Sequence, residues 1–549
     1  MTLNRCSRWL AIIGGAVLLW TLILALRGSG WSVTLLGLRL SSRDPYRSLV
    51  TGALLASIGL AGIRFTWPGE RRLAICAGAA AAAALVLGVT YGTYVAASAD
   101  TYGYVSQADL WITGSLVTPT PLASEARWRD AEWAMTPLGY RPALRAGFMV
   151  PIYPMGLPLT MAATKVVIGD VGAFVVSPLL GALTVWLTYL LGRALHSAEA
   201  GVLAAFTLLA SPIFLFYLMV PMSDVPVTAW WLGAVVLALK PDVRWRLVMS
   251  GVATAIALLT RPNLVLLTVP MAMLVIHGAS PRRTTLTRLL LWGIPASLGA
   301  IGVATFNMLL YGSPLTSGYG ALETLYSPSY TWTNLRYFGT WLLQTQTPFV
   351  FLGVAAASWR ARWCLVFALC VLASYVWYTP FDHWTFLRFL LPALPMLLAT
   401  AAATLVTLTR RYDLPSGVAL SVGVLLVCVG LWQGRETFSL ATVEARYRAA
   451  ADMVSRAVPP DAVVICNEHS GSIRSYAGRA TLRFEWLGED EYDTALRTLR
   501  EHGHASYVLL DGYEVATFRG RYARVTDLAW LDRLPLGTID RRVFLYEVP

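Results

Sequence analysis

Four charged side chains stand where long apolar runs of this sequence end or are interrupted. Asp100 and Asp224 each lie a few residues beyond such a run, Arg261 interrupts one in the segment LLTRP, and Arg388 begins one in LRFLLPALP. A positioned carboxylate can act as a general base. An arginine can grip a phosphate with two parallel hydrogen bonds. These residue types therefore favour a reaction site.

Each of these residues also has a purely structural interpretation. Asp is a preferred helix N-cap, so Asp100 and Asp224 could each cap the helix that follows. Arg388 could reach toward lipid headgroups, and Arg261 could pair with either acid. An ionised residue near bilayer depth is nevertheless costly and usually faces a cavity or a partner. Two acids and two arginines beside a tyrosine-rich loop fit a reaction site better than four separate structural roles.

The elements that must position these residues are membrane spans. The chain of 549 residues is 56% hydrophobic and only 13% charged. Its apolar residues are concentrated in many runs close to the roughly 20 residues that cross a bilayer. The net charge of +12 lies mostly in short loops between these runs, as expected of cytoplasmic loops, so it does not indicate nucleic acid. The sequence therefore predicts a polytopic α-helical membrane protein surrounded by lipid.

The topology follows from the basic residues, starting with a cytoplasmic N-terminus at Arg5 and Arg8. The run Leu247–His277 is read as two half-length helices broken at Pro262, because this keeps later arginine-rich loops cytoplasmic. The count is then about 13 spans. Both acids and both arginines fall near the outer surface. The first large outer loop is expected to carry interfacial helices over YVSQADLWITGSL and FMVPIYPMGLPLTMAATKVV.

The sequence changes character at Gly434, where charge rises and apolar runs shorten. Strand-like pieces such as AVVIC and ASYVLLD alternate with helical patterns such as Tyr492–His502. We therefore expect an extracytoplasmic soluble α/β domain with Cys466 as a free thiol. This domain is expected to help acceptor docking more than chemistry. The predicted domains are an N-terminal transmembrane pair (1–72), a catalytic transmembrane module (73–433) and the soluble domain (434–549).

Several motifs occur in the order found in a known enzyme family. They are ADTYGYVSQA around Asp100, YPMGLPL at Tyr153–Leu159, SPIFLFYLMVPMSDVP around Asp224, LLTRP, YGSPLTSGY and LRFLLPALP. Taken together, these motifs resemble GT-C fold glycosyltransferases of the protein O-mannosyltransferase and aminoarabinose transferase type. The sequence departs from the family in its additional N-terminal pair of spans and in Thr101, which stands where the mannosyltransferases carry a second acid.

The resemblance implies an inverting transfer of a sugar from a polyprenyl-phosphate donor to an acceptor hydroxyl. Asp100 would be the catalytic base, with Asp224 as a second acid. Two groups of residues complete the implied site: donor or phosphate binding by Arg388, Arg261, His383 and Asp382, and sugar or acceptor lining by Tyr102, Tyr104, Gln107 and Tyr153. No Asp-x-Asp stands in either catalytic loop, so we expect no protein metal ligands, no certain cofactor and weak metal dependence, with a bound divalent metal as the alternative.

Other functions remain as alternatives at this point. A lipid-linked polysaccharide ligase or polymerase would depend on arginines that contact a diphosphate. A transporter would show matching interrupted helices in two halves, whereas this sequence has one break, at Arg261–Pro262. The abundance of Ala, Gly and Arg indicates a bacterial protein of the inner membrane, with its active site on the extracytoplasmic face. The acceptor could be protein, lipid or cell-wall glycan.

Overall fold

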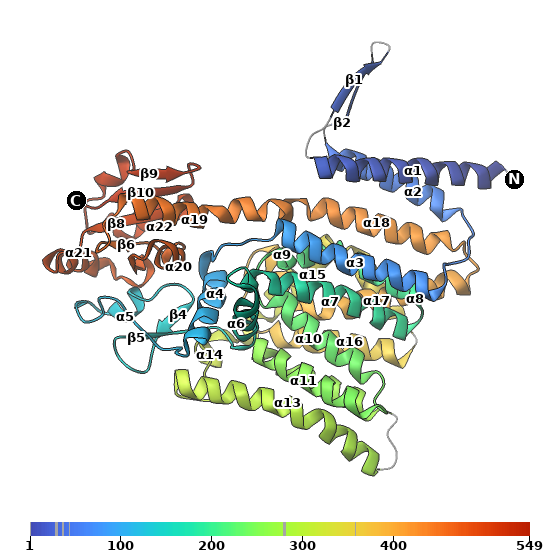
Figure 1. Cartoon of the computed structure of the whole chain (residues 1–549), viewed down its shortest axis with the longest axis horizontal. Coiled ribbons are helices and arrows are strands. Elements are labelled where there is room, and N and C mark those ends of the chain that lie inside the picture. The colour runs from blue at the N-terminus through green and yellow to red at the C-terminus, as the bar shows by residue number, and fades with distance from the viewer. Residues whose placement is uncertain (1, 28–30, 36–37, 43, 278–281, 357) are drawn as a thin grey trace.

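The computed structural model describes the chain except residues 1, 28–30, 36–37, 43, 278–281 and 357. A bundle of helices forms most of the molecule, and a smaller mixed unit lies at one end of it (Figure 1). The bundle helices are α1 (Thr2–Arg27), α2 (Pro45–Ala61), α3 (Glu70–Tyr91), α7 (Gly172–Leu195), α8 (Ala198–Leu209), α9 (Pro212–Met219), α10 (Asp224–Ala238), α11 (Arg244–Thr260), α12 (Thr268–Ile276), α13 (Arg282–Tyr311), α15 (Thr331–Gln346), α16 (Trp359–Tyr375), α17 (Leu394–Arg411) and α18 (Gly417–Gln433).

Short 3₁₀ segments, a single helical turn and a hairpin connect the bundle helices. They are β1 (Trp31–Leu35), β2 (Leu38–Ser42), η1 (Pro262–Leu267), α14 (Leu322–Leu325), η2 (Pro328–Tyr330), η3 (Pro348–Ala355) and η4 (Trp384–Ala393). By length and composition, five helices of the described residues could cross a membrane, or up to seven if each of two bent pairs is one span. This supports a multi-pass membrane protein but does not establish the predicted count of about 13.

Proline explains where the apolar runs bend. The predicted break at Pro262 is confirmed, because α11 ends at Thr260 and Arg261 adopts extended backbone before η1. The apolar run Ala198–Val220 likewise forms two helices, α8 and α9, bent by 62°. Pro212 begins α9 and has no N–H to continue the hydrogen bonds of α8.

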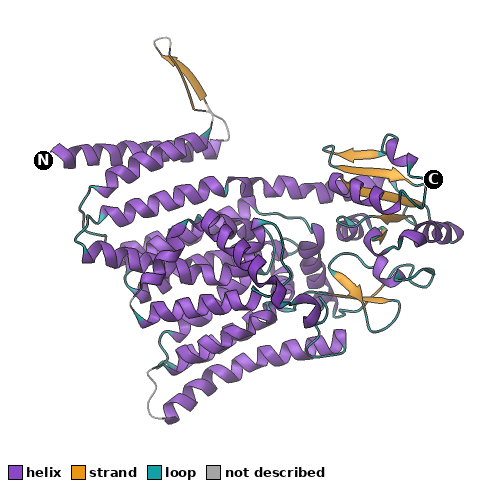
Figure 2. Cartoon of the chain, turned by 180° about the vertical axis from the view of Figure 1, so that it is seen from behind, coloured by secondary structure: helices purple, strands orange, loops and turns teal. Residues whose placement is uncertain are grey.

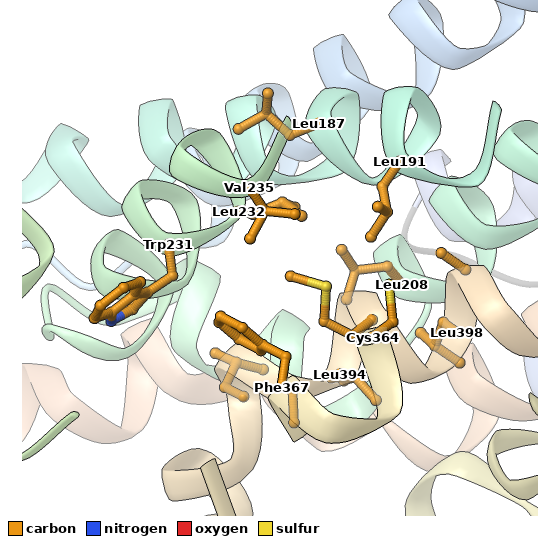
Figure 3. Close-up of a cluster of buried hydrophobic side chains, with 14 of the residues drawn as sticks. Leu187, Leu191, Leu208, Trp231, Leu232, Val235, Cys364, Phe367, Leu394 and Leu398 are labelled. Atoms are coloured by element: carbon orange, nitrogen blue, oxygen red, sulfur yellow. The ribbon is translucent and has the colours of Figure 1, made fainter. Parts of the chain in front are cut away.

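The bundle core is apolar and closely packed around α7, α8, α10, α16 and α17. Leu187, Leu208, Trp231, Phe367 and Leu398 are among its buried members, and they point toward one another in Figure 3. In a membrane, burial of this kind does not itself drive helix association, because lipid tails are equally apolar. The close fit of these side chains instead fixes where the helix ends lie, and those ends carry the charged residues.

The first long loop (residues 92–171) contains helices and a small sheet. Its elements are α4 (Ser98–Thr113), β3 (Thr118–Pro119), α5 (Ala131–Ala134), β4 (Tyr140–Pro142), β5 (Phe148–Pro151) and α6 (Gly156–Ile168). The expected interfacial helices correspond to α4 and α6. The expected helix is wrong over residues 148–151, where β5 pairs antiparallel with β3 and β4. Pro151 and Pro154 prevent a helix from starting before Gly156.

The tail domain (residues 434–549) follows α18 and lies beside the first long loop in both views (Figures 1 and 2). Its elements are η5 (Arg435–Ser439), α19 (Leu440–Ala457), β6 (Val463–Ile465), α20 (Ser470–Ser472), η6 (Ile473–Ala477), β7 (Ala480–Leu482), η7 (Phe484–Trp486), η8 (Glu489–Glu491), α21 (Tyr492–Glu501), β8 (Ser506–Asp511), α22 (Gly512–Tyr522), η9 (Ala529–Asp532), β9 (Gly537–Ile539) and β10 (Val543–Glu547). The sheet order is β7-β6-β8-β10-β9, with β6 parallel to β7 and β8.

The core of the tail domain includes residues from the first long loop. Trp128, Ala134 and Met135 are buried in the same hydrophobic cluster as Val463 and Val508. The loop therefore completes one face of the tail domain, and the two parts of the chain are packed as a unit. The Cys466 thiol is free, as the sequence predicts, and it is buried.

Candidate functional site

The predicted charged residues come from four helical elements. Asp100 lies in the first turn of α4 and Asp224 opens α10, while Arg261 directly follows α11 and Arg388 lies within η4. The N-cap residues are Ala97 for α4 and Ser223 for α10, and neither makes a side-chain hydrogen bond to the first turn of its helix. Neither aspartate occupies the N-cap position itself, so the structure does not support the capping interpretation for Asp100 or Asp224.

The Asp100 carboxylate is held from both sides. The hydroxyl of Tyr153 donates to Oδ1 at 2.7 Å, and Nη1 of Arg388 donates to Oδ2 at 3.0 Å. The side chain of Asp100 is 33% exposed and that of Arg388 is 15% exposed. The carboxylate is therefore oriented by two donors while one part of it stays accessible.

Arg388 lies against aromatic rings and keeps donors to spare. Its guanidinium carbon is 5.0 Å from the ring centre of Phe386, 5.4 Å from that of Phe389 and 5.8 Å from that of Tyr217. Among the described residues, none accepts a hydrogen bond from its Nε. A planar guanidinium stacked on rings keeps its orientation. The Nε–H group is therefore a buried donor without an acceptor among the described residues, and an unsatisfied buried donor of this kind calls for a partner.

The second carboxylate is sealed inside the protein. Asp224 is fully buried, and its Oδ1 accepts a hydrogen bond from Nη2 of Arg261 at 2.6 Å. Arg261 also donates from Nε to the Ser223 hydroxyl at 3.0 Å and from Nη1 to the Tyr375 hydroxyl at 3.3 Å. This pair joins α10, α11 and α16, and the Asp224 carboxylate lies too deep to contact a substrate without movement.

Tyr104 links the two carboxylate–arginine pairs. Its hydroxyl donates to the same Ser223 oxygen at 3.0 Å, and its ring centre is 4.4 Å from that of Tyr153. Tyr153 in turn holds Asp100. A short chain of ring and hydroxyl contacts therefore runs from the buried pair to the accessible one.

The remaining predicted residues take different places. Gln107 is buried, and its Nε2 donates to the backbone oxygen of Tyr153 at 3.2 Å. This hydrogen bond helps to fix the backbone that carries Tyr153. Tyr102 packs instead against Gly471 of the tail domain, and its ring centre lies 5.7 Å from that of Tyr140. Tyr102, Tyr104 and Tyr153 are all buried, so sugar or acceptor lining by these tyrosines stays a prediction.

Asp382 and His383 lie on an exposed loop just before η4. His383 accepts a hydrogen bond at Nδ1 from the backbone N–H of Thr385 at 3.4 Å, and so caps the start of η4. Its observed contact thus positions the segment that carries Arg388. Within the described part of the chain, the ion pairs of Arg388 and Arg261 are made with Asp100 and Asp224 and not with Asp382. Direct phosphate binding by Asp382 and His383 stays a prediction.

The sequence analysis did not single out Ser223, Tyr217 or Tyr319. Ser223 is the shared acceptor of Tyr104 and Arg261, Tyr217 donates to the Thr385 backbone oxygen at 3.0 Å, and the ring centre of Tyr319 is 5.8 Å from that of Tyr153. Ser223 directly precedes Asp224, and Tyr319 closes the YGSPLTSGY segment. All three lie inside motifs quoted above, and that position was the feature of the sequence from which they could have been predicted.

Metal binding finds little support in the donor set. Over the described ranges, no group of three or more His, Cys, Asp and Glu side chains is arranged to hold an ion. Each site carboxylate is paired with an arginine, whereas a protein-bound divalent cation normally takes several oxygen ligands. Weak metal dependence therefore stays a prediction.

The chain is similar to known proteins in part of its sequence and in its fold. Residues 153–308 match the family model described as dolichyl-phosphate-mannose-protein mannosyltransferase. The crystal structure of ArnT from Cupriavidus metallidurans bound to undecaprenyl phosphate is 13% identical, with a TM-score of 0.52 over 85% of this chain and 96% of that one. Archaeal oligosaccharyltransferase AglB from Archaeoglobus fulgidus, in complex with an inhibitory peptide and a dolichol-phosphate, is 12% identical, with a TM-score of 0.52 over 83% of this chain and 72% of that one.

No curated protein sequence matches the chain. At such low identity, the two solved structures establish the fold, and the family model covers the segment from Tyr153 into α13. The predicted resemblance to the GT-C class is thereby confirmed: the chain has the fold of these solved structures, and residues 153–308 match the mannosyltransferase family model. That class is one of membrane glycosyltransferases that use lipid-linked donors.

Proposed function

We propose that the protein transfers a sugar from a polyprenyl-phosphate donor to an acceptor hydroxyl at the outer face of a bacterial inner membrane, with inversion. In this proposal the chain spans the membrane about 13 times, and its tail domain is extracytoplasmic. One observation carries the proposal: the partly exposed Asp100 carboxylate lies between Tyr153 and Arg388, whose Nε is unused among the described residues. The lipid phosphates named for the two solved relatives support the choice of donor class.

The chemistry follows from these contacts. The acceptor oxygen attacks the anomeric carbon, its proton passes to Asp100, and the bond from that carbon to the phosphate oxygen breaks. The electron pair leaves with the polyprenyl phosphate, which gains negative charge as it departs. A guanidinium at this position stabilises the developing charge more strongly in a site shielded from water. Arg388 is the residue with donors for that role.

Arg388 also connects donor binding to the base. In the free protein its Nη1 is bound to Asp100 at 3.0 Å. A phosphate that engages the guanidinium competes for the same N–H groups, and this loosens the hold on the carboxylate. Asp100 is then better placed to accept the proton of the acceptor hydroxyl. The donor thus prepares the base before the acceptor reacts.

The buried Asp224–Arg261 pair has an indirect role in this account. It fixes Ser223 and, through Tyr104 and Tyr153, the orientation of Asp100. Asp224 is therefore proposed to orient the site and not to take the proton itself. Arg261 neutralises Asp224 in the same way that Arg388 neutralises Asp100. Its predicted contact with a donor phosphate stays a prediction.

The direct test is incubation of the purified full-length protein in lipid with a panel of polyprenyl-phosphate sugars. We expect release of polyprenyl phosphate from at least one donor, and loss of that release in Asp100→Asn. Asp109→Asn is the matched control, because Asp109 lies on the same helix and pairs with Lys165 on α6. Failure of the wild-type protein to release or transfer any sugar would contradict the proposed function.

A further inference from the structure

The tail domain contacts the turn that carries Asp100. The Ser98 hydroxyl donates to Oε2 of Glu468 at 2.9 Å, and the backbone N–H of Ala96 donates to the Tyr476 hydroxyl at 2.7 Å. Both acceptors belong to the segment that follows strand β6, residues 466–476. We call this the docking segment. Two hydrogen bonds therefore reach from the tail domain to residues just before Asp100.

Close packing reinforces these hydrogen bonds. A Cβ on Gly471 would come within 2.2 Å of the Tyr102 ring, so only glycine allows the docking segment to approach α4 this closely. The Ser470 hydroxyl accepts a hydrogen bond from the Leu138 N–H at 3.1 Å. Arg474 donates to the backbone oxygen of Met135. The docking segment thus lies against both α4 and the part of the first long loop that follows α5.

The backbone at the contact is unusual. Ser98 has a φ of +49°, a conformation that few residues other than glycine adopt. A residue held in this region is strained and persists where its surroundings impose the conformation. The Ser98 contact with Glu468 is such a constraint. Asp100 follows only two residues later, so a change at Ser98 rotates the first turn of α4 and moves the carboxylate.

Glu468 is itself held firmly within the tail domain. Its backbone N–H donates to Oε1 of Glu514 at 3.2 Å, and the Tyr447 hydroxyl donates to its Oε2 at 3.3 Å. Glu514 also caps α22 by accepting a hydrogen bond from the Asp511 N–H at 2.8 Å. The Glu468 carboxylate is therefore placed by the tail-domain fold and not by the helix that it contacts.

We propose that Glu468 is a positioning residue for the transfer reaction: through Ser98 it fixes the first turn of α4 and hence the Asp100 carboxylate. The inference rests on the proposed function, in which Asp100 is the base. It gives the tail domain a part in the chemical step, beyond the acceptor docking expected from the sequence. The step itself is unchanged, because Glu468 neither touches the substrate nor exchanges a proton with it.

The kinetic test compares Glu468→Ala with Glu468→Gln in the full-length protein. A base displaced by about 1 Å loses up to about 100-fold in rate, so we expect kcat to fall by about 10- to 100-fold in the alanine variant, with donor KM nearly unchanged. The glutamine variant keeps an amide oxygen that accepts from Ser98 and should retain most activity. Equal losses in both variants, or a rise in donor KM with kcat unchanged, would overturn the proposal.

A second comparison asks whether Glu468 acts through Asp100. In the Asp100→Asn background, Glu468→Ala should cause no further loss of kcat, because the group that it positions is already disabled. The losses of kcat caused by Glu468→Ala and by Ser98→Ala should likewise be non-additive, because both substitutions remove the same hydrogen bond between Ser98 and Glu468. Multiplicative losses in either pair contradict the proposal. Glu491→Ala is the matched control: Glu491 contacts the backbone of Arg129 in the first long loop and should leave kcat unchanged.

Hydrogen exchange separates this inference from the proposed function. In Glu468→Ala, the amides of the first turn of α4 should exchange faster, while those of β6, β8 and the bundle helices keep their wild-type rates. This result is independent of any sugar donor. If the wild-type protein transfers no sugar, the proposed function fails, and the exchange data still decide whether Glu468 orders the Asp100 turn. Unchanged exchange in that turn would overturn the inference.

Discussion

The two carboxylate–arginine pairs of this protein are chemically alike but differ in depth. The Asp224–Arg261 pair is 2.6 Å apart, and the Asp224 side chain is fully buried. The Asp100–Arg388 pair is 3.0 Å apart, and the Asp100 side chain is 33% exposed. A sealed pair can exchange partners only if the surrounding helices move, whereas an accessible pair can open when a substrate anion arrives. Burial therefore distinguishes the two pairs where residue type does not, and the proposed base belongs to the more accessible pair.

The buried Asp224–Arg261 pair should contribute more to the free energy of unfolding than the Asp100–Arg388 pair. Removing one partner of a buried ion pair leaves the other charge uncompensated and typically costs about 3–5 kcal/mol. We expect Asp224→Asn to lower the free energy of unfolding by about this amount, and Asp100→Asn to lower it by much less. Urea unfolding of the full-length protein in detergent compares the two variants.

A double variant provides the control for this result. Replacing both members, Asp224→Leu with Arg261→Met, removes both buried charges and should recover much of the lost stability. If Asp224→Asn unfolds at the wild-type urea concentration, or if the double variant is less stable than the single one, the structural role of the buried pair is contradicted.

A further buried acid, Glu514, sharpens the comparison because backbone N–H groups and not an arginine hold it. Burial in the tail domain raises the pKa of Glu514 to about 7, although hydrogen bonds from Asp511 and Glu468 oppose this rise. The folded state therefore keeps a proton that the unfolded chain releases near pH 4.5. The contribution to stability should be fully present below that pH and be lost as the pH rises toward 7. The difference between the two pKa values corresponds to about 3 kcal/mol in all.

Amide exchange of β8 and β10, corrected for the intrinsic effect of pH, measures this trend in the full-length protein. Glu514→Gln is neutral at every pH and should flatten it. A tail domain that becomes more stable between pH 5 and pH 7, or an unchanged slope in Glu514→Gln, would contradict the assignment.

The accessible pair should dominate donor binding. Arg388→Lys keeps the positive charge but loses the planar pair of donors that matches a phosphate. The donor KM should rise by about 10-fold, equivalent to about 1.4 kcal/mol, with little change in stability. Arg410→Lys is the matched control, because Arg410 pairs with Glu199 outside the site at 3.1 Å. Wild-type donor kinetics in Arg388→Lys would contradict phosphate binding and favour the structural interpretation, in which Arg388 only reaches toward lipid headgroups.

The sequence predicted that four charged residues gather at one site, and the structure brings them together in two linked pairs, but their surroundings were not predicted. Asp100, Asp224, Arg261 and Arg388 could be found because a charge beside an apolar run is costly and therefore conspicuous. The break at Pro262 could be predicted because proline lacks the N–H that continues a helix. The strands of the tail domain were likewise visible as short apolar pieces between polar ones.

Pairing and depth could not be read from the sequence. Arg261 could have paired with either acid, and only the packing of α10 against α11 brings it to Asp224. The helix expected over residues 148–151 is a strand, because its pairing with β3 and β4 depends on a distant part of the loop. The contact between Ser98 and Glu468 joins residues 370 positions apart. Such tertiary contacts leave no local pattern.

The central claim is that Asp100 accepts the proton of the acceptor hydroxyl, and its most direct test is single-turnover transfer by Asp100→Asn beside Asp224→Asn. Asparagine keeps the shape of the side chain but cannot take the proton. We expect Asp100→Asn to fold, to bind donor and to lose transfer by about 10²–10⁴-fold, and the fraction of Asp224→Asn that remains folded to lose less. Transfer by Asp100→Asn at the wild-type rate would contradict the claim.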